Sequence, residues 1–367
     1  MRHIGIDARL THYRTGGIST YIRRLVQALE LLDARNRYTV FHSRKMRETI
    51  TTRFRRASLW TPAHHRTERL ALSVELARFN LDLFHSPDFI PPLSGAKRHI
   101  ITVHDLTFLH YPQHLTADAR RYYNDQIAAA VRHADHILTD SEASKRDMIA
   151  MLHVPPEQIT VHMLGVDESF RPPDQAALKA CREALDLPLG YILFVGTFEP
   201  RKNIAGLLRA YRLLLDRLPN APPLVLAGTR GWLFDETMRD IALLHLGDRV
   251  LWRENIPQAS MPALYGLARV LVVPSFYEGF GLTALEAMAC GTPTIVSNRS
   301  SLPEVVGAVG LQVNPDDDNH IAKALHTGVV DEDWHTNESA KAIVRAAQFR
   351  WEDTARIALS VYESVMS

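Results

Sequence analysis

The 367-residue sequence is poor in cysteine and has no long apolar runs. Its two cysteines, Cys181 and Cys290, are too few for a disulfide framework or a thiolate metal site, which fits a reducing compartment. No uninterrupted apolar stretch reaches the ~18 residues that a membrane span needs. The start, MRHIGIDARL, is typical of a strand rather than of a signal peptide. These absences predict a cytoplasmic globular protein in which cysteine chemistry plays no part.

Several short catalytic motifs are also missing. The sequence contains no P-loop, HExxH, GxSxG or paired CxxC motif, so metal-dependent and serine-hydrolase chemistry lack their residues. The run at 316–318 consists of three aspartates, but it follows Asn314-Pro315 and precedes a helical pattern, so turn and helix-cap roles explain it. We expect no metal site and no cofactor.

Net charge is almost absent, because 42 Lys and Arg residues face 41 Asp and Glu residues. The balance hides an asymmetry: residues 1–172 carry 24 basic and 18 acidic side chains, and residues 173–367 carry 18 and 23. Eight basic residues lie between Arg44 and Arg69, interleaved with apolar ones such as Trp60. Such a stretch can contact an anionic membrane, a phosphorylated substrate or nucleic acid, although most are solvated faces. Of these partners we keep peripheral contact with an anionic membrane and expect no nucleic acid.

The hydrophobic pattern predicts a parallel α/β protein. Short β-branched runs alternate with helical patterns, which predicts parallel sheets covered by helices. The expected strands are HIGID, YTVFHS, LDLFHS, HIITVHD, HILTDS and ITVHML in the first half, then YILFVGT, PLVLAG, RVLWREN, RVLVVPS, PTIVSN and GLQVN. At ~150 residues per domain, the length predicts two domains with a cleft between them.

The domain boundary is expected where the strand series breaks, at GVDESFRPPDQ, because two prolines and a polar stretch interrupt any regular element. We therefore predict a first domain at 1–170 and a second at 171–348. A C-terminal helix at 349–367 is expected to return to the first domain.

The segment 191–218 is the first candidate site. It reads as a buried strand, a turn and an amphipathic helix, with Asn203 as the expected helix N-cap. Arg201 and Lys202 then lie beside the helix N-terminus, where free backbone N–H groups and the helix dipole favour an anion. This arrangement suits a phosphate or diphosphate.

The segment 269–298 is the second candidate site and again reads as strand, glycine-rich turn, helix and strand. Gly279 and Gly281 allow close backbone approach to a ligand. Glu278 lies in the turn and Glu286 eight residues on, within about 80° of the same helix face, so both can border one cleft. The apolar neighbours of Glu286 imply that its carboxylate needs a partner.

A dinucleotide fingerprint competes for the same turn, because residues 279–284 match G-x-G-x-x-A. That interpretation requires an acidic residue about 20 positions on, at the end of the next strand. The next strand instead ends in Ser297 and Asn298. The mismatch argues against NAD binding.

Two further positions occur at strand-to-helix turns in the first half. Gly16 and Gly17 precede the helical run STYIRRLVQALELL, and their lack of side chains allows close approach to a substrate. His104 closes the strand HIITVHD at what would be the same kind of edge. Taken alone, each is more often structural than functional.

Taken together, these segments resemble the GT-B retaining glycosyltransferases of family 4. GTFEPRKN, PSFYEGFGLTALEAMACGTPTIVSN and LPEVVGAVGLQVNPDD resemble the second domain of that family, and the GGIS and VHDL segments resemble the first. The resemblance covers nearly the whole chain except the basic stretch. It implies two Rossmann-like domains whose parallel sheets face a central cleft.

The resemblance also implies a reaction, namely transfer of a sugar from a nucleotide diphosphate donor with retained anomeric configuration and no required metal. Glu278 would lie against the sugar and diphosphate, Glu286 would bind the ribose hydroxyls, and His104 would contact the sugar. The implied catalytic residues are Glu278, His104, Lys202 and Arg201. The implied donor-binding residues are Gly16, Gly17, Arg201, Lys202, Glu278, Gly279, Phe280, Gly281, Leu282, Thr283 and Glu286.

GTFEPRKN and HDLTFLHYP resemble most the branch that includes bacterial mannosyltransferases of surface-polysaccharide assembly. GDP-mannose is therefore the expected donor, with UDP-linked sugars left open, and the acceptor is a saccharide, a lipid-linked oligosaccharide, a phospho-sugar or a soluble metabolite. A lipid-linked acceptor would place the protein at the inner face of the membrane. Two alternatives remain from the sequence: a nucleotide-sugar epimerase on the same scaffold, and a module that binds a nucleotide sugar without turnover.

Overall fold

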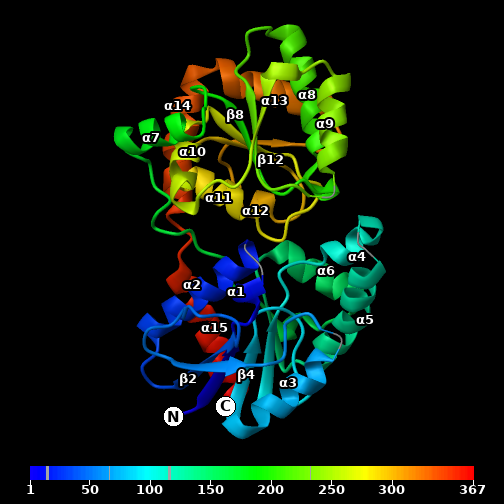
Figure 1. Ribbon diagram of the computed structural model, residues 1–367, viewed down its shortest axis with the longest axis vertical. Coiled ribbons are helices and arrows are strands. Elements are labelled where there is room, and N and C mark those ends of the chain that lie inside the picture. Colours follow the sequence, from blue (N-terminus) through cyan, green and yellow to red (C-terminus); the bar gives the residue numbers. More distant parts are fainter. Residues whose placement is uncertain (14–15, 66, 115–116, 232) are drawn as a thin grey trace. The chain divides into compact units, whose positions relative to one another are not determined.

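The computed structural model describes residues 1–13, 16–65, 67–114, 117–231 and 233–367. The chain forms two compact units (Figure 1). Unit 1 consists of Met1–Gly165 and Arg350–Ser367, and unit 2 consists of Val166–Phe349. The chain therefore passes from one unit to the other twice.

Unit 1 is built on a parallel sheet whose described strands have the order β3-β2-β1-β4-β5-β6-β7. The central strands are buried on both faces, as helices on either side of a parallel sheet require. The strand order reverses between β1 and β4, and ligands of open α/β sheets bind outside the carboxyl ends of the strands at such a point. The strands are β1 His3–Asp7, β2 Arg37–Ser43, β3 Arg55–Leu59, β4 Leu81–Ser86, β5 Ala96–Thr102, β6 His136–Thr139 and β7 Ile159–Val161.

The helices of unit 1 follow its strands along the chain. In α2, the buried residues Tyr21, Ile22, Leu25, Val26 and Leu29 recur at helical spacing and form one apolar face. The helices of this unit are α1 Leu10–Tyr13, α2 Gly17–Leu32, α3 Glu68–Leu76, α4 Thr107–His110, α5 Ala117–His133, α6 Glu142–Leu152 and α15 Trp351–Met366, with 3₁₀ turns at Ala77–Phe79, Pro112–His114 and Pro156–Gln158.

The C-terminal helix α15 packs against α2 within unit 1 (Figure 1). Its Tyr362 hydroxyl lies 2.7 Å from His85 Nδ1, and His85 Nε2 lies 2.8 Å from Thr102 Oγ1. The hydroxyl of Tyr21 on α2 lies 2.9 Å from the same Thr102 oxygen. All four side chains are buried, so this hydrogen-bonded chain joins α15, β4, β5 and α2 inside the unit.

Unit 2 is built on a second parallel sheet, with the order β10-β9-β8-β11-β12-β13. The expected parallel α/β architecture is thus confirmed in both units. Here the strand order reverses between β8 and β11. The strands are β8 Ile192–Val195, β9 Leu224–Ala227, β10 Val250–Arg253, β11 Val270–Val273, β12 Thr294–Ser297 and β13 Leu311–Val313.

Side-chain caps begin several helices of unit 2. Asp174, Asp317 and Asp331 each accept a hydrogen bond from a backbone N–H three residues on, so Asp317 has the helix-cap role expected within the run at 316–318. The helices are α7 Gln175–Ala184, α8 Ile204–Arg217, α9 Phe234–Leu243, α10 Met261–Leu267, α11 Leu282–Ala289, α12 Leu302–Val306, α13 Asp318–Val330 and α14 Glu332–Ala346, with 3₁₀ turns at Pro200–Lys202, Gly247–Arg249 and Gln258–Ser260.

The basic stretch contains a strand that the sequence analysis missed. β3 is an edge strand in which two of five residues are exposed arginines, so its apolar pattern is weak. The Arg53 guanidinium donates to the backbone oxygens of Glu30 and Asp33, and that of Arg56 to Met46 and Arg47. These two arginines act as structural donors. The Arg44 guanidinium instead lies 4.0 Å from the centroid of the exposed Trp60 ring.

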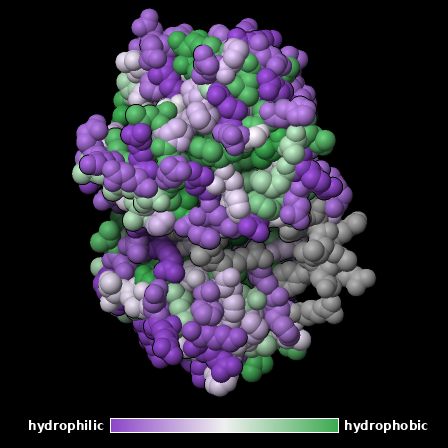
Figure 2. Space-filling view, turned by 45° about the horizontal axis from the view of Figure 1, so that its top comes forward, coloured by the Kyte–Doolittle hydropathy of each residue, from purple (hydrophilic) through white to green (hydrophobic). Residues whose placement is uncertain are grey.

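No helix of the described residues is long and apolar enough to cross a membrane. Hydrophilic and hydrophobic side chains are interspersed over the face drawn in Figure 2.

We expect Tyr362→Phe to destabilise unit 1, because it leaves the buried His85 Nδ1 without its partner. A buried polar group left unpaired costs ~1–3 kcal/mol. Tyr13→Phe is the matched control, since the Tyr13 hydroxyl also lies near a side-chain oxygen, 3.0 Å from Ser43 Oγ, but its side chain is exposed. Urea unfolding of the two variants should separate them; equal stabilities would contradict a structural role for the Tyr362 hydroxyl.

Candidate functional site

The turn after β8 is fixed by Asn203. Its side chain accepts a hydrogen bond from the Gly206 N–H at 3.2 Å, which confirms the expected N-cap of α8. The backbone of Asn203 has φ 54°, a left-handed conformation that asparagine tolerates better than most residues. Its amide nitrogen also donates to the carbonyl oxygens of Pro274 (3.2 Å) and Pro315 (2.7 Å). One side chain therefore joins the turns that follow β8, β11 and β13.

Glu278 lies in the turn after β11 and forms the centre of a buried ion cluster. Its Oε1 lies 2.6 Å from Lys202 Nζ and 2.7 Å from Ser275 Oγ, and its Oε2 lies 2.8 Å from Arg201 Nη1. Burial opposes ionisation, but Lys202 and Arg201 outweigh it and lower the pKa of Glu278 to about 2. Glu278 is therefore a carboxylate at neutral pH, held at the reversal point of the unit 2 sheet.

The predicted anion site at 201–202 is thus already charge-paired. Arg201 also places its Nε 2.9 Å from Glu199, so two carboxylates and two cations meet where the turns after β8 and β11 come together. Lys202 is almost fully buried and Arg201 is partly exposed. The pairing fixes both cationic groups in place before any ligand arrives, which lowers the reorganisation that anion binding requires.

The glycine-rich turn leads directly into α11. Gly281 has φ 108° and precedes the helix, where a Cβ would lie 2.7 Å from Leu302 Cδ2, so glycine is required. Phe280 is buried against Phe349. Leu282 and Thr283 form the first turn of the helix, whose N–H groups lack partners within it. These amides can receive an anion, as the sequence pattern predicts.

Glu286, on α11, has the partner that its apolar surroundings require. The Tyr265 hydroxyl donates to its Oε2 at 2.8 Å. Burial raises the pKa of Glu286 to about 7, and the hydrogen bond from Tyr265 opposes that rise. Two glutamates eight residues apart therefore differ in charge near neutral pH: Glu278 is ionised and Glu286 titrates.

The remaining predicted residues lie in unit 1. Gly16 has φ 124° and is exposed, so its conformation rather than crowding favours glycine, and Gly17 begins α2. Residues 14–15 of the same turn lie outside the described part of the chain. His104 follows β5, at the same carboxyl edge of the sheet as this turn after β1.

His104 uses both of its ring nitrogens. Nδ1 lies 2.7 Å from Asp140 Oδ2, and Nε2 lies 2.9 Å from the Pro87 carbonyl oxygen. Because both neighbours are acceptors, the ring must donate twice, which only the charged imidazolium can do. Burial opposes that charge, but Asp140 outweighs it and raises the pKa of His104 to about 9. His104 is therefore a fixed positive charge with both N–H groups occupied.

Three contributors to these sites were not found in the sequence. Ser275, Tyr265 and Asp140 each bond to a predicted residue. Ser275 lies three residues before Glu278, within the segment PSFYEGFG that resembles the family, so the sequence could have indicated it. Tyr265 and Asp140 are 21 and 36 residues from their partners, and no local spacing marks them. Among the described residues, no group of three or more His, Cys, Asp or Glu side chains is arranged to hold a metal ion.

The two units, each built on a parallel α/β sheet, match the GT-B fold of solved glycosyltransferase structures. Residues 15–170 match Glycosyltransferase Family 4, and residues 182–348 match Glycosyl transferases group 1. The sucrose-phosphate synthase structure from Thermosynechococcus elongatus has this fold, with a TM-score of 0.78, 24% identity, and 100% of this chain and 99% of that chain covered.

The family follows from sequence relatives. The chain is 35% identical over 285 residues to the O-antigen chain mannosyltransferase B of Escherichia coli, which covers 77% of this chain and 74% of that protein. It is 30% identical over 260 residues to the D-inositol 3-phosphate glycosyltransferase of Corynebacterium glutamicum strain R, covering 68% of this chain and 62% of that protein. The chain belongs to glycosyltransferase family 4, and it is a glycosyltransferase.

The charge of His104 makes the stability of the fold depend on pH. The pKa of His104 in the fold, about 9, lies above its ordinary value of 6.5, so protonated His104 stabilises the folded chain. The contribution is fully present below pH 6.5 and is lost as pH rises through about 9, with an upper limit of ~3 kcal/mol. Asp140→Asn should flatten this dependence in urea unfolding measured between pH 6 and 9.

Asp147→Asn is the control for that measurement. Asp147 Oδ2 lies 2.9 Å from His110 Nε2, but this pair is more exposed than the His104 pair. The variant should keep the wild-type pH dependence. An Asp140→Asn slope equal to that of wild type would show that Asp140 does not hold the His104 charge.

Proposed function

We propose that this glycosyltransferase transfers mannose from GDP-mannose to a saccharide or lipid-linked acceptor, with retention of configuration and without a required metal ion. The identity to an O-antigen mannosyltransferase supports the sugar. The observation that carries the proposal is the buried cluster of Glu278 with Lys202 and Arg201, next to the N-terminus of α11.

The cluster fits the charges that sugar transfer develops. The departing diphosphate becomes more negative, and Arg201, Lys202 and the first amides of α11 are placed to stabilise it. The sugar becomes oxocarbenium-like and gains positive charge, which the ionised Glu278 can stabilise. With a pKa of about 2, Glu278 is unsuited to act as a general acid near neutral pH. Its proposed role is therefore electrostatic.

The proposed donor contacts of the other residues follow from their hydrogen bonds. Glu286 accepts from Tyr265 on Oε2, so Oε1 is available to accept both ribose hydroxyls. Gly16 and Gly17 offer backbone to the diphosphate and acceptor. For His104 the proposal changes, because both N–H groups are occupied: what it offers a bound donor is positive charge rather than a free N–H.

Product analysis tests the proposal against its two alternatives. Incubation of GDP-mannose labelled in the sugar with a panel of mannosides should give labelled oligosaccharide and GDP, also in the presence of EDTA. An epimerase would give a changed nucleotide sugar without an acceptor, and a binding module would give no product. A thermal-shift panel of GDP-, UDP-, ADP- and dTDP-sugars tests the base, since a ligand at 100 times its Kd stabilises by about 2.7 kcal/mol.

A lipid-linked acceptor would place the protein at the cytoplasmic face of a membrane. Exposed Trp60 and the exposed side chains of Arg44, Lys45 and Arg47 support peripheral contact with anionic lipid. Attraction of ~1 kcal/mol per basic residue is expected near such a surface. Co-sedimentation with anionic and neutral vesicles tests this contact, and equal binding to both would argue against it.

Glu278→Gln should lower kcat by roughly 10² to 10³, the loss expected when one preorganised stabilising group is removed. Binding of GDP should change less, because the variant keeps the shape of the side chain. Glu338→Gln is the matched control: Glu338 is also buried in unit 2, pairs with Lys341 at 2.7 Å and accepts from the Gly310 N–H. Near-native turnover of Glu278→Gln would remove the catalytic assignment.

Glu286 should make GDP affinity depend on pH. Its ionised form accepts ribose hydroxyls best, and its pKa is about 7, so affinity should rise as pH increases through 7. Tyr265→Phe removes a hydrogen bond that lowers this pKa, so the midpoint should move to higher pH. Titration calorimetry of GDP binding to wild type and Tyr265→Phe from pH 5.5 to 8.5 measures the shift in midpoint. The ionisation of GDP affects both titrations equally, so it cancels in the comparison.

Tyr191→Phe is the control for this shift. The Tyr191 hydroxyl is buried in the same unit and donates to the Leu264 carbonyl oxygen at 2.6 Å, next to Tyr265 in the chain. Its loss disturbs the same region without touching Glu286. A midpoint that moves equally in both variants would mean that Tyr265 acts only through packing.

A further inference from the structure

A second polar site lies at the reversal point of the unit 1 sheet. His64 follows β3 and Asp88 follows β4, so both lie at the carboxyl ends of parallel strands, as the Gly16 turn after β1 does. His64 Nε2 is 2.5 Å from Asp88 Oδ2, and the two side chains are 18% and 20% exposed. The sequence analysis did not single out either residue.

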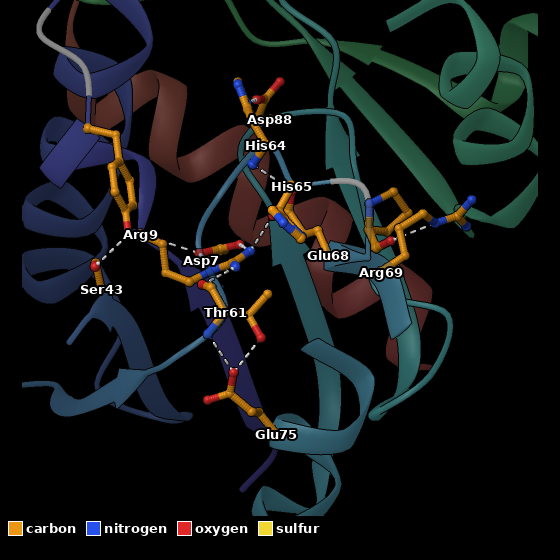
Figure 3. Close-up of polar contacts among 12 residues, drawn as sticks. Asp7, Arg9, Ser43, Thr61, His64, His65, Glu68, Arg69, Glu75 and Asp88 are labelled. Carbon is orange, nitrogen blue, oxygen red and sulfur yellow. Dashed lines mark hydrogen bonds and ion pairs between the residues drawn. The ribbon is translucent and has the colours of Figure 1, made fainter. Parts of the chain in front are cut away.

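A buried ion cluster holds the His64 loop in position (Figure 3). The Arg9 guanidinium is 1% exposed and donates to Asp7 (2.6 Å), to Glu68 Oε1 (2.7 Å) and to the Thr61 carbonyl oxygen (2.9 Å). The other oxygen of Glu68 accepts from the His64 backbone N–H at 2.7 Å. Figure 3 shows His64 and Asp88 at one end of these contacts and, at the other, Glu75, whose Oε1 accepts from the Thr61 N–H at 2.7 Å.

The backbone of His64 is also unusual. Its φ of 62° is left-handed, a conformation that costs a non-glycine residue energy and persists only when the surroundings enforce it. Buried charges such as Arg9 are likewise costly unless they are fully paired. Together, the left-handed backbone of His64 and the ion cluster around Arg9 hold the imidazole of His64 against Asp88.

Asp88 can accept further hydrogen bonds. Its Oδ1 accepts from the Phe89 N–H at 2.9 Å and its Oδ2 lies against His64, which leaves lone pairs on both oxygens. Burial opposes its ionisation, but His64 and His104 lower the pKa of Asp88, so it is charged at neutral pH. His104 by contrast has both N–H groups occupied, and its partner Asp140 is only 3% exposed. Asp88 is therefore a more accessible carboxylate than Asp140.

An aromatic ring lies beside the pair. The centroid of the half-buried Tyr123 ring is 5.9 Å from that of His64, edge to face, and Phe89 and Phe108 pack against Tyr123. Small-molecule sites combine apolar or aromatic walls with a few fixed polar groups. A carboxylate next to an aromatic ring fits a sugar, which offers both hydroxyl donors and an apolar face.

We propose that His64 and Asp88 form a subsite for the acceptor saccharide, in which Asp88 accepts hydrogen bonds from sugar hydroxyls and Tyr123 flanks the ring. This deepens the proposed function, on which it rests only in regarding the bound saccharide as the acceptor. The described charges at this edge include the carboxylates of Asp7, Glu68, Asp88 and Asp140 against the Arg9 guanidinium and the His104 imidazolium. Carboxylates outnumber these cations, so a neutral sugar is favoured over a phosphorylated one. The acceptor would then differ from the one named for the inositol phosphate relative.

The test compares binding of methyl α-D-mannopyranoside and D-inositol 3-phosphate to the full chain by ligand-observed NMR. Wild-type protein should bind the mannoside more tightly than the phosphate. Asp88→Asn should weaken mannoside binding at least about tenfold, the loss expected for a hydrogen bond to a charged group. His64→Asn is a second variant that tolerates the left-handed backbone and should also weaken mannoside binding.

Asp135→Asn is the matched control, because Asp135 also accepts a backbone N–H, from His99, and pairs with a cation, Arg98. Its side chain is 26% exposed, but it precedes β6 and so lies at the opposite edge of the sheet. It should bind the mannoside like wild type. Absence of mannoside binding by wild type, unchanged binding by Asp88→Asn, or equal loss in Asp135→Asn would each overturn the subsite.

GDP titration of the same proteins separates this inference from the proposed function. GDP binding should be equal in all of them, because none of the substituted residues is among the proposed nucleotide contacts. Loss of the mannoside in Asp88→Asn without GDP binding by any protein would refute the donor assignment and leave the subsite standing. GDP binding with an unaltered mannoside affinity in Asp88→Asn would do the reverse.

Discussion

The carboxylate of Glu278, buried between Lys202 and Arg201, is the interaction on which the site of unit 2 depends. A buried charge is tolerated only when it is paired and hydrogen-bonded, and Glu278 meets that condition with two cations and the Ser275 hydroxyl. The same contacts tie the turn after β8 to the turn after β11, which are the two strands at the sheet reversal. The helix-cap residue Asn203 ties the same two turns through a backbone carbonyl. Removing the charge of Glu278 would therefore weaken the link between the two turns and also remove the carboxylate proposed to stabilise the transferred sugar.

Unit 1 meets the same constraint with the signs exchanged. At its sheet reversal a guanidinium, Arg9, is held by the carboxylates of Asp7 and Glu68, whereas in unit 2 a carboxylate is held by two cations. The group that each network presents toward solvent differs accordingly. Unit 2 presents the partly exposed Arg201 beside the first amides of α11, and groups of this kind can bind phosphate oxygens. Unit 1 presents the partly exposed Asp88, whose carboxylate can accept from hydroxyls. A sugar transfer needs both kinds of recognition, one for the leaving group and one for the group that attacks.

The sequence predicted the fold well, because buried parallel strands are continuous apolar runs and the helices between them are amphipathic. β3 was missed because an edge strand with exposed arginines lacks that run. Asn203 and the Glu278 turn were predictable, since a cap and a glycine-rich turn are local patterns. Tyr265 and Asp88 were not predictable, because the proposed role of each depends on a hydrogen bond to a residue more than 20 positions away. Patterns of residue spacing cannot predict contacts between residues that are brought together only by the order of strands in the sheet.

The two glutamates of the α11 segment illustrate why position in a motif does not fix a role. Glu278 and Glu286 have the same side chain; Glu278 is buried and Glu286 is half-buried, and loss of water alone would raise the pKa of both. Only Glu278 faces cations, and their attraction exceeds the burial cost, so its pKa falls to about 2. Glu286 faces a neutral hydroxyl, which offsets burial only in part, so its pKa stays near 7. A change in activity near neutral pH that arises within this segment would therefore come from Glu286, while Glu278 keeps its charge throughout.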